Sequence, residues 1–573
     1  MSAAHGRLAR TLGVTDTWAI ATGAMFSSGF FLLPGLAAAE TGSSVVLAYL
    51  CAGLLMIPPM LCQAELATAM PRAGGAYYFI DRALGPLAGA VGGVSAWIAL
   101  VLKSAFALVG LGAYLAILVD VPIAATAAGM GIAFTLLNLR GADHASSAQR
   151  WLVIVLVGTL TVFVAAGAMH AFGPARTAAE PIAWSTAEFL TNGWGGFAAT
   201  VGLVSVSYAG LTKVASVAEE VRDPDRSLPV GMILALVTAT ALYVAGVSVL
   251  LAVMPQATLF ADLAPVGSAA EVVFTGGWAM VGRGIVIAAA VAAFVSTANA
   301  GVLAAARYPF AMGRDRLAPE ALSRLSKSGV PVAAVLVTGS AMVFSILALD
   351  VASLAKLASA VALLLYGGIG VSVIVMREAR LDGYHPGFRS PLYPFMPLAT
   401  VAISLALLIA MGIKPIAFAL TLVAVGATAW AAFGRTRAHR RGAILHVFRR
   451  LGAAATPGVE RELGAILAER ALEDGGRRTE MTAHVDVTDR GPWSAWAHRP
   501  LRSLHLPAGV LVVLVERDGD VFVPTGDDLI EPSDRLTLVG RPEALERALD
   551  QADEAAGVSD TGSHPAASGL APA

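Results

Sequence analysis

Charged residues are scarce in this chain. They make up 14% of the 573 residues, whereas hydrophobic residues make up 57%, and an average soluble domain is roughly 25% charged. This composition excludes a protein that is soluble throughout and predicts one that is integral to a membrane. The net charge of −1 indicates no partner, because in a membrane protein the distribution of Lys and Arg is informative and their sum is not. We expect contact with membrane lipid and no nucleic-acid partner.

Cysteine and the common catalytic motifs are also nearly or wholly missing. The two cysteines, Cys51 and Cys62, lie eleven residues apart on one predicted helix, or about 16 Å at 1.5 Å per residue, which is too far for a disulfide. The chain has no H-E-x-x-H, G-x-S-x-G or P-loop motif. We therefore expect no enzyme activity, no catalytic residue, no ATP site, no metal site and no cofactor.

Twelve apolar runs are long enough to cross a membrane as helices. They cover residues 14–37, 44–66, 87–119, 122–139, 151–171, 195–215, 230–254, 272–306, 331–349, 352–376, 393–412 and 415–433. No short apolar core with a cleavage site precedes them, so the first run is interpreted as a retained span. The sequence predicts an all-α transmembrane domain of twelve helices over residues 14–433, after an N-terminal segment at 1–13.

Basic residues are concentrated on one side of this predicted domain. The opposite loops are mainly acidic, with few basic exceptions. The basic side includes Arg7, Arg10, Arg72, Arg82, Arg140, Arg150, Arg222, Arg226, Arg307, Arg314, Arg316 and Arg435. Because cytoplasmic loops carry the excess of Lys and Arg, we expect a multi-pass protein of the cell inner (plasma) membrane with both termini in the cytoplasm.

Two of the apolar runs carry Ser and Gly where a continuous helix is expected. They are TGAMFSSGFFLLPG (22–35) and SVSYAGLTKVASVAEE (205–220). A bilayer offers no water to freed backbone groups, so a broken helix is tolerated only where it lines a cavity or is buried in protein. Equivalent breaks in two repeats indicate a transporter's binding site. These breaks fall in the first and sixth runs, the equivalent places in two five-helix repeats.

Lys103 stands out among the polar residues of the spans. It lies about sixteen residues from either end of the third run, and an ionisable group at that depth suggests a functional site. A lysine held out of water can titrate near neutral pH. Two interpretations stay open: a structural lysine held by backbone carbonyls or a hydroxyl, or a fixed positive charge or proton-titrating group beside a substrate cavity.

Four stretches of the chain carry a family resemblance. They are GAMFSSGFFLLPG in the first run, ELATAMPRAGGAYYFIDRALGP (65–86), VAEEVRDPDRSLPVG (217–231) and AAARYPFAMGRDRLAPEALSRLSKSGVP (304–331). In this order they resemble the amino acid/polyamine/organocation (APC) superfamily of permeases over about residues 13–433. The resemblance implies a leucine-transporter-type fold. Helices 1–5 and 6–10 would form inverted repeats, helices 11 and 12 would lie outside, and access would alternate around a midplane site.

The two breaks predict a substrate site with two poles. At Ser27, Ser28 and Gly29, the start of a half-helix offers free N–H groups, which suit a carboxylate. Near Tyr208, Ala209 and Gly210, freed carbonyls would accept hydrogen bonds from an ammonium group. One zwitterion satisfies both poles, with Lys103 beside them. Tyr208 is a candidate gate over the substrate, although a tyrosine in a span is as often a packing residue.

The coupling ion is left open by the sequence. Many members of the resembled family carry a basic residue on the fifth helix in place of sodium, but WLVIVLVGTLTVFVAAGAM (151–169) has none. The first-helix motif also departs from the family, with Ser27 in place of its first glycine. Ser296 and Thr297 could donate oxygens to Na⁺, or could simply pack between helices. Lys103 is the candidate for proton coupling.

Four charged residues next to the predicted spans are candidates for gating. They are Arg72, Glu219, Glu220 and Arg222. Their opposite charges could pair when the inward path closes, and Gly74 and Gly75 beside Arg72 favour a tight turn. The alternative is that these charges set the topology and solvate the loops.

The composition changes after the basic residues at 435–441. We expect a linker with an amphipathic helix at 434–478, a small α/β cytoplasmic domain at 479–550 and a disordered tail at 551–573. Strand-like runs and a hairpin signal at Asp518-Gly519 mark the domain. It resembles the C-terminal regulatory domain of potassium-transport (TrkA/RCK) proteins, which implies dimerisation and a small regulatory ligand. A passive dimerisation module is the alternative, and without a Gly-rich fingerprint NAD is not expected.

Three functions remain after these observations. The first is a secondary active transporter that imports or exchanges an amino acid or related amine, coupled to H⁺ or Na⁺ and modulated by the C-terminal domain. The second is a transporter or channel for K⁺ or another inorganic ion, suggested by the tail. The third is a nutrient sensor that signals through the tail.

Overall fold

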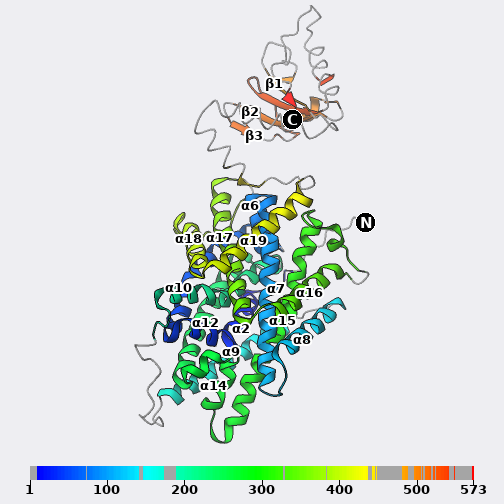
Figure 1. Cartoon of the computed structure of the whole chain (residues 1–573). Helices are drawn as coiled ribbons and strands as arrows, with labels where there is room; N and C mark the ends of the chain where they lie inside the picture. The colour runs from blue at the N-terminus through cyan, green and yellow to red at the C-terminus, as the bar shows by residue number, and fades with distance from the viewer. Residues whose placement is uncertain are drawn as a thin grey trace, which may run out of the picture. The chain divides into compact units, whose positions relative to one another are not determined.

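The structure is a computed structural model of the whole chain. It describes residues 10–72, 74–140, 146–172, 189–326, 329–381, 384–435, 442–444, 447, 481–487, 496–504, 506–507, 510–517, 520–522, 524, 526–540, 547–548 and 571–572. The chain divides into two compact units, residues 1–448 and 449–573, and Figure 1 shows that helices build the first and strands the second.

The regular secondary structure described in the first unit is helical, apart from an isolated β-bridge between Leu12 and Val221. Its first half contains α1 (Val14–Met25), α2 (Ser28–Phe31), α3 (Leu33–Thr41), α4 (Val45–Leu55), α5 (Ile57–Ala69), α6 (Gly75–Leu84), α7 (Pro86–Ala116), α8 (Ile123–Leu139), α9 (Ser146–Phe172) and α10 (Gly193–Val204). Its second half contains α11 (Gly210–Ser216), α12 (Pro224–Val253), α13 (Gln256–Ala261), α14 (Pro265–Val273), α15 (Ala279–Arg314), α16 (Val332–Ala348), α17 (Val351–Glu378), α18 (Phe395–Ala410) and α19 (Ile413–Ala429). Short 3₁₀ segments include Ser205–Tyr208 and Ala218–Glu220.

The twelve predicted apolar runs are mainly helical in the structure, but the run at 14–37 is divided among α1, α2 and α3, and the run at 272–306 between α14 and α15. Eight helical segments of the described chain are long and apolar enough to cross a membrane, and α8, α16 and α18 are shorter apolar helices. The predicted first span is not among the eight, because the break at Phe26 and Ser27 leaves α1 only 12 residues long. The chain is thus a mostly helical, multi-pass membrane protein.

The long helix α7 lies at the centre of the packing. It packs along α15, α17, α6 and α19, while α1 packs on α11 and α12. The turn before α6 follows the sequence expectation, since Gly74 and Gly75 have φ values of 126° and 52°, a region that glycine enters without strain. Cys51 lies on α4 and Cys62 on α5, and both are free thiols.

A buried carboxylate fastens α5 to α17. Glu65 is fully buried and accepts two hydrogen bonds from Arg377, at 2.7 and 2.6 Å. The Tyr384 hydroxyl donates to the same carboxylate at 2.9 Å, and so does the Ser390 amide. Burial, and then the Glu65 charge, raise the pKa of Tyr384, so this hydroxyl stays a proton donor. A bidentate, fully hydrogen-bonded pair of this kind is costly to break from one side.

The second unit contains a five-stranded sheet. The strands are β1 (Met481–Asp486), β2 (Leu511–Arg517), β3 (Asp520–Phe522), β4 (Arg535–Gly540) and β5 (Ala571–Pro572), in the order β3-β2-β4-β1-β5. All neighbours are antiparallel. Arg517 is paired opposite Asp520, on either side of the predicted turn at Asp518-Gly519.

Several sequence predictions lie outside the described residues. These are the N-terminal segment up to residue 9, most of the linker and amphipathic helix at 434–478, the Asp518-Gly519 turn itself and most of the expected tail at 551–573. Within that tail, Ala571 and Pro572 are described, and they pair with β1.

We expect Glu65→Gln to lower the free energy of unfolding by about 3 kcal/mol, because it leaves the Arg377 charge in a half-buried site without its partner. Thermal unfolding of the purified protein in detergent measures the loss. The matched control is Glu271→Gln, which breaks a more exposed pair with Arg283 and should change stability by less than about 1 kcal/mol. Equal losses in the two variants would contradict the role given to Glu65.

Candidate functional site

The first helix is interrupted in the interior of the protein. α1 ends at Met25, Ser27 has φ −125° and ψ −112°, and α2 begins at Ser28. The Ser27 amide donates to the Met25 carbonyl at 2.9 Å. The amides of Ser28 and Gly29 donate to no residue in the described part of the chain. The break therefore presents two buried N–H donors without an acceptor among the described residues.

Three tyrosine hydroxyls satisfy the backbone carbonyls around this break. Each donates from a different helix, and each tyrosine is fully buried. The pairs are Tyr243 to Met25 at 2.7 Å, Tyr49 to Gly29 at 3.0 Å and Tyr114 to Phe31 at 3.0 Å. Side-chain donors thus replace the helical hydrogen bonds that the break removes, as a membrane interior requires.

The second break is a 3₁₀ segment, Ser205–Tyr208, between α10 and α11. Tyr208 is fully buried, and its hydroxyl donates to the Tyr49 carbonyl at 2.8 Å. Its ring packs edge-on against Tyr243, with centroids 5.3 Å apart. Tyr208 therefore belongs to an aromatic cluster, which we define as Phe26, Phe30, Phe31, Tyr49, Tyr114, Tyr208, Tyr243 and Phe294.

Glycines let the two broken helices approach closely. A Cβ on Gly29 would lie 2.7 Å from both the Ser207 and Tyr243 hydroxyl oxygens. A Cβ on Gly210 would lie 2.5 Å from the Ala21 carbonyl oxygen. The second contact is with backbone, which cannot move aside as a flexible side chain can. The two breaks are therefore held together by positions that admit no side chain.

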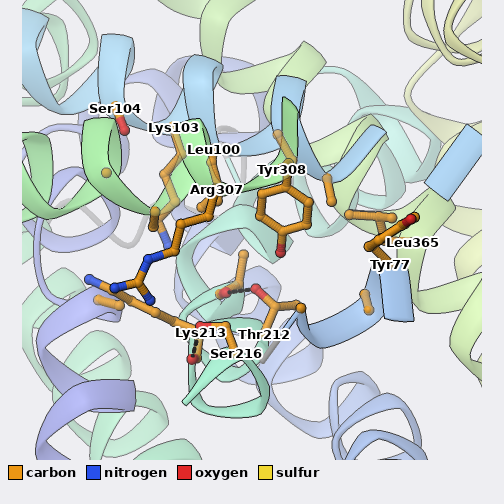
Figure 2. Close-up of a pocket in the computed structure, with 18 of the residues that line it drawn as sticks. Tyr77, Leu100, Lys103, Ser104, Thr212, Lys213, Ser216, Arg307, Tyr308 and Leu365 are labelled. Atoms are coloured by element: carbon orange, nitrogen blue, oxygen red, sulfur yellow. Dashed lines mark hydrogen bonds between the residues drawn. The ribbon is translucent and has the colours of Figure 1, made fainter. Parts of the chain in front are cut away.

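A cavity of about 370 Å³ lies beside the breaks. It reaches from Ala24 and Ala209 to Gly74, Glu220 and Arg314, so it connects the middle of the unit with the end that carries the predicted cytoplasmic loops. Figure 2 shows its lining side chains. Such a volume suits a small ligand.

The predicted binding and coupling residues divide between the cavity and its surroundings. Lys103, Ala209 and Thr297 line it. Ser27, Ser28, Gly29, Tyr208 and Gly210 are buried and are not among the lining residues, and Ser296 is half-buried and also outside the lining.

The predicted gating residues also differ in location, since only some of them line the cavity. Glu220 lines the cavity, whereas Arg72 and Arg222 are exposed and Glu219 is half-buried. The Arg222 amide donates to the Leu12 carbonyl at 2.8 Å, and the Leu12 amide donates to the Glu220 carbonyl at 3.0 Å. Backbone pairing thus ties the chain before α1 to the chain after α11.

Basic side chains gather in the cavity, and sequence reasoning overlooked two of the three central ones. Lys103, Lys213 and Arg307 converge on one side of it in Figure 2. Lys213 lies in the stretch quoted for the second break, three residues after Gly210. A lysine so close to a break was a usable signal. Arg307 belongs to the fourth motif stretch, and no sequence feature set it apart from the other arginines there.

Comparison with known proteins agrees with the architecture of the first unit. The model of the amino acid permease family matches residues 16–432, nearly three quarters of the chain. The chain belongs to the amino acid permease family. The family is one of transporters within the APC superfamily. The TrkA-C domain model matches residues 491–552, so this permease carries a TrkA-C domain C-terminal to its transport unit in the sequence.

Similar proteins include permeases that are named for different classes of amino acid. The branched-chain amino acid permease BcaP of Bacillus subtilis (strain 168) is 28% identical over 429 residues, 71% of this chain and 89% of its own length. The aromatic amino acid transport protein AroP of Salmonella typhimurium (strain SL1344) is 26% identical, covering 72% and 92%. The vacuolar cationic amino acid transporter 2 of Arabidopsis thaliana is 30% identical, covering 66% and 61%.

We expect Gly210→Ala to reduce transport at least about tenfold and to destabilise the permease by about 1–3 kcal/mol, because the added methyl meets the Ala21 carbonyl oxygen. Transport in vesicles and thermal unfolding in detergent measure the two effects. Gly158→Ala on α9 is the matched control, since no atom lies within 4 Å of its Cβ and alanine favours helix. If Gly210→Ala behaves like this control, the close approach is not required.

Proposed function

We propose that this permease is a secondary active transporter that imports or exchanges an amino acid or related amine by alternating access. The cavity beside the two helix breaks carries the proposal. In the proposed architecture, the twelve apolar runs are twelve membrane spans. The first ten form two inverted five-helix repeats, and the last two lie outside them. The protein lies in the cell inner (plasma) membrane, with both termini in the cytoplasm. The substrate occupies the cavity between the repeats.

The cavity geometry supports an inward-facing state in this proposal. We place its mouth at the lining residues Gly74, Glu220 and Arg314, on the side that the positive-inside rule makes cytoplasmic. The aromatic cluster fills the route from the breaks toward the other end. There Lys356 on α17 and Glu40 on α3 pair at 2.5 Å. Opening outward would require the aromatic cluster to open and the Glu40–Lys356 ion pair to break.

The substrate poles predicted from the sequence remain part of the proposal. The free amides of Ser28 and Gly29, with Ser27 beside them, would accept a carboxylate once the helices rearrange. The backbone around Tyr208, Ala209 and Gly210 would accept an ammonium group. Ala209 already faces the cavity, while the other residues lie behind it and would hold the breaks in place.

Coupling is proposed to involve the polar residues of the cavity. Lys103 lines it from the middle of α7, where it can exchange a proton with the substrate path. Thr297 lines it from α15, and a Na⁺ ion would need this hydroxyl together with Ser296 and backbone carbonyls of the first helix. We favour proton coupling through Lys103, because its side chain reaches the cavity without an ion pair to any described residue.

The remaining charged residues and the second unit are proposed to regulate transport. The proposed gating residues lie before α6 and after α11, next to the cavity mouth. They are Arg72, Glu219, Glu220 and Arg222, and they would change ion-pair partners when the mouth closes. The TrkA-C domain would modulate the permease, respond to a small regulatory ligand and pair with the same domain of a second copy. These roles follow from the family resemblance of the domain.

Uptake by the full-length protein in proteoliposomes tests the proposed function. We expect a labelled amino acid to accumulate under a pH or Na⁺ gradient. We expect Lys103→Gln to abolish gradient-driven uptake while the purified variant keeps its thermal stability, because the glutamine amide cannot take up and release a proton as the lysine amine does. Lys414→Gln, which removes an exposed lysine outside the cavity, is the control.

Other outcomes separate the alternatives. Movement of ⁸⁶Rb⁺ with no amino acid transport would contradict the proposal and favour an inorganic ion transporter. Amino acid binding without any transport would favour a nutrient sensor. Unchanged gradient-driven uptake in Lys103→Gln would return Lys103 to a structural role.

We expect the Glu40–Lys356 pair to control opening away from the cavity mouth. Lys356→Glu places two carboxylates together, and like charges repel, so an outward-open population should increase. Accessibility of a single cysteine introduced at Ser28, a buried residue that cysteine matches closely in size, to a water-soluble thiol reagent, in a variant lacking Cys51 and Cys62, measures the shift. The double variant Glu40→Lys with Lys356→Glu restores opposite charges and should restore low accessibility; unrestored accessibility would contradict the gate.

A further inference from the structure

The charge of the cavity lining is strongly unbalanced. Four basic side chains line it, Lys103, Lys213, Arg307 and Arg314, against one acidic side chain, Glu220. None of the four basic side chains forms an ion pair with a described residue. A cation at membrane depth is costly unless an anion or dipole compensates it. The described lining therefore carries a net positive charge.

Three separate elements bring the positive charges together. Lys103 comes from α7, Lys213 from α11 and Arg307 from α15. Figure 2 shows their side chains converging from these ribbons onto one side of the cavity. Side chains of like charge that share one lining repel each other. Like charges held in this way form a site that a multiply charged anion would neutralise.

We propose that the cavity selects an acidic amino acid, whose side-chain carboxylate binds the Lys103, Lys213 and Arg307 side chains while its α-carboxylate and ammonium group take the two poles at the helix breaks. This inference rests on the proposed function, because it names the substrate class of the same cavity. A neutral zwitterion would leave most of the positive charge uncompensated. A cationic amino acid would add to it.

The proposal differs from what the names of the similar proteins suggest. Those names refer to branched-chain, aromatic and cationic amino acids. Specificity is a difference in affinity between substrates, and unpaired charges act against the wrong one. The three central cations act most strongly against a cationic substrate. Sequence identity near 30% leaves ample room for such a change in the lining.

Parallel uptake measurements test the inference in proteoliposomes that contain the full-length protein. Labelled glutamate, leucine and arginine are offered under the same gradient, with unlabelled aspartate as competitor. We expect glutamate uptake with aspartate competition, and arginine uptake at least about tenfold lower. We expect Lys213→Gln and Arg307→Gln to raise the KM for glutamate about ten- to a hundredfold, the effect of one lost charge-assisted hydrogen bond. Lys213→Arg keeps the charge and should retain most of the affinity.

The outcomes separate the substrate class from the general function. Uptake of leucine or arginine without glutamate would overturn the acidic selectivity and leave the transporter in place. No uptake of any amino acid by wild-type protein would overturn both. An equal KM increase for glutamate and leucine in Lys213→Gln would show a general structural effect and overturn the role of that charge. Lys414→Gln is the control for loss of a positive charge outside the cavity.

Discussion

The backbone groups released at two helix breaks impose the main constraint on this fold. A membrane interior offers no water, so every freed carbonyl needs a donor from the protein. Tyr49, Tyr114 and Tyr243 supply these donors at the first break. Because each tyrosine comes from a different helix, the break can exist only when α4, α7 and α12 are packed around it. The local irregularity thus depends on the whole bundle.

The same tyrosines also pack around the breaks. Their rings, with the neighbouring phenylalanines, form the buried aromatic cluster. The lining of the cavity beside the breaks includes small residues such as Ala24 and Ala209 together with long basic side chains. One set of residues therefore both donates hydrogen bonds to the first break and packs the apolar surroundings of that break.

Particular residues show how far sequence reasoning reached. Lys103 was found because a lysine in the middle of an apolar run is conspicuous, and it does line the cavity. Tyr208 was a candidate gate over the substrate with packing as the alternative, and its hydroxyl donates to the Tyr49 carbonyl within the aromatic cluster. Lys213 and Arg307 were overlooked as cavity residues. Their importance depends on lying near Lys103, and these three residues are separated by more than ninety positions along the chain.

The sequence by itself determined the membrane class, the helical runs, the two breaks and the TrkA-C resemblance, because each depends on local composition or on a contiguous motif. The tertiary structure alone decided which side chains satisfy the breaks, which faces of α7, α11 and α15 meet, and where the cavity lies. Those features depend on contacts between distant segments. A helical pattern indicates that a face is apolar or polar, and only packing determines which other face it meets.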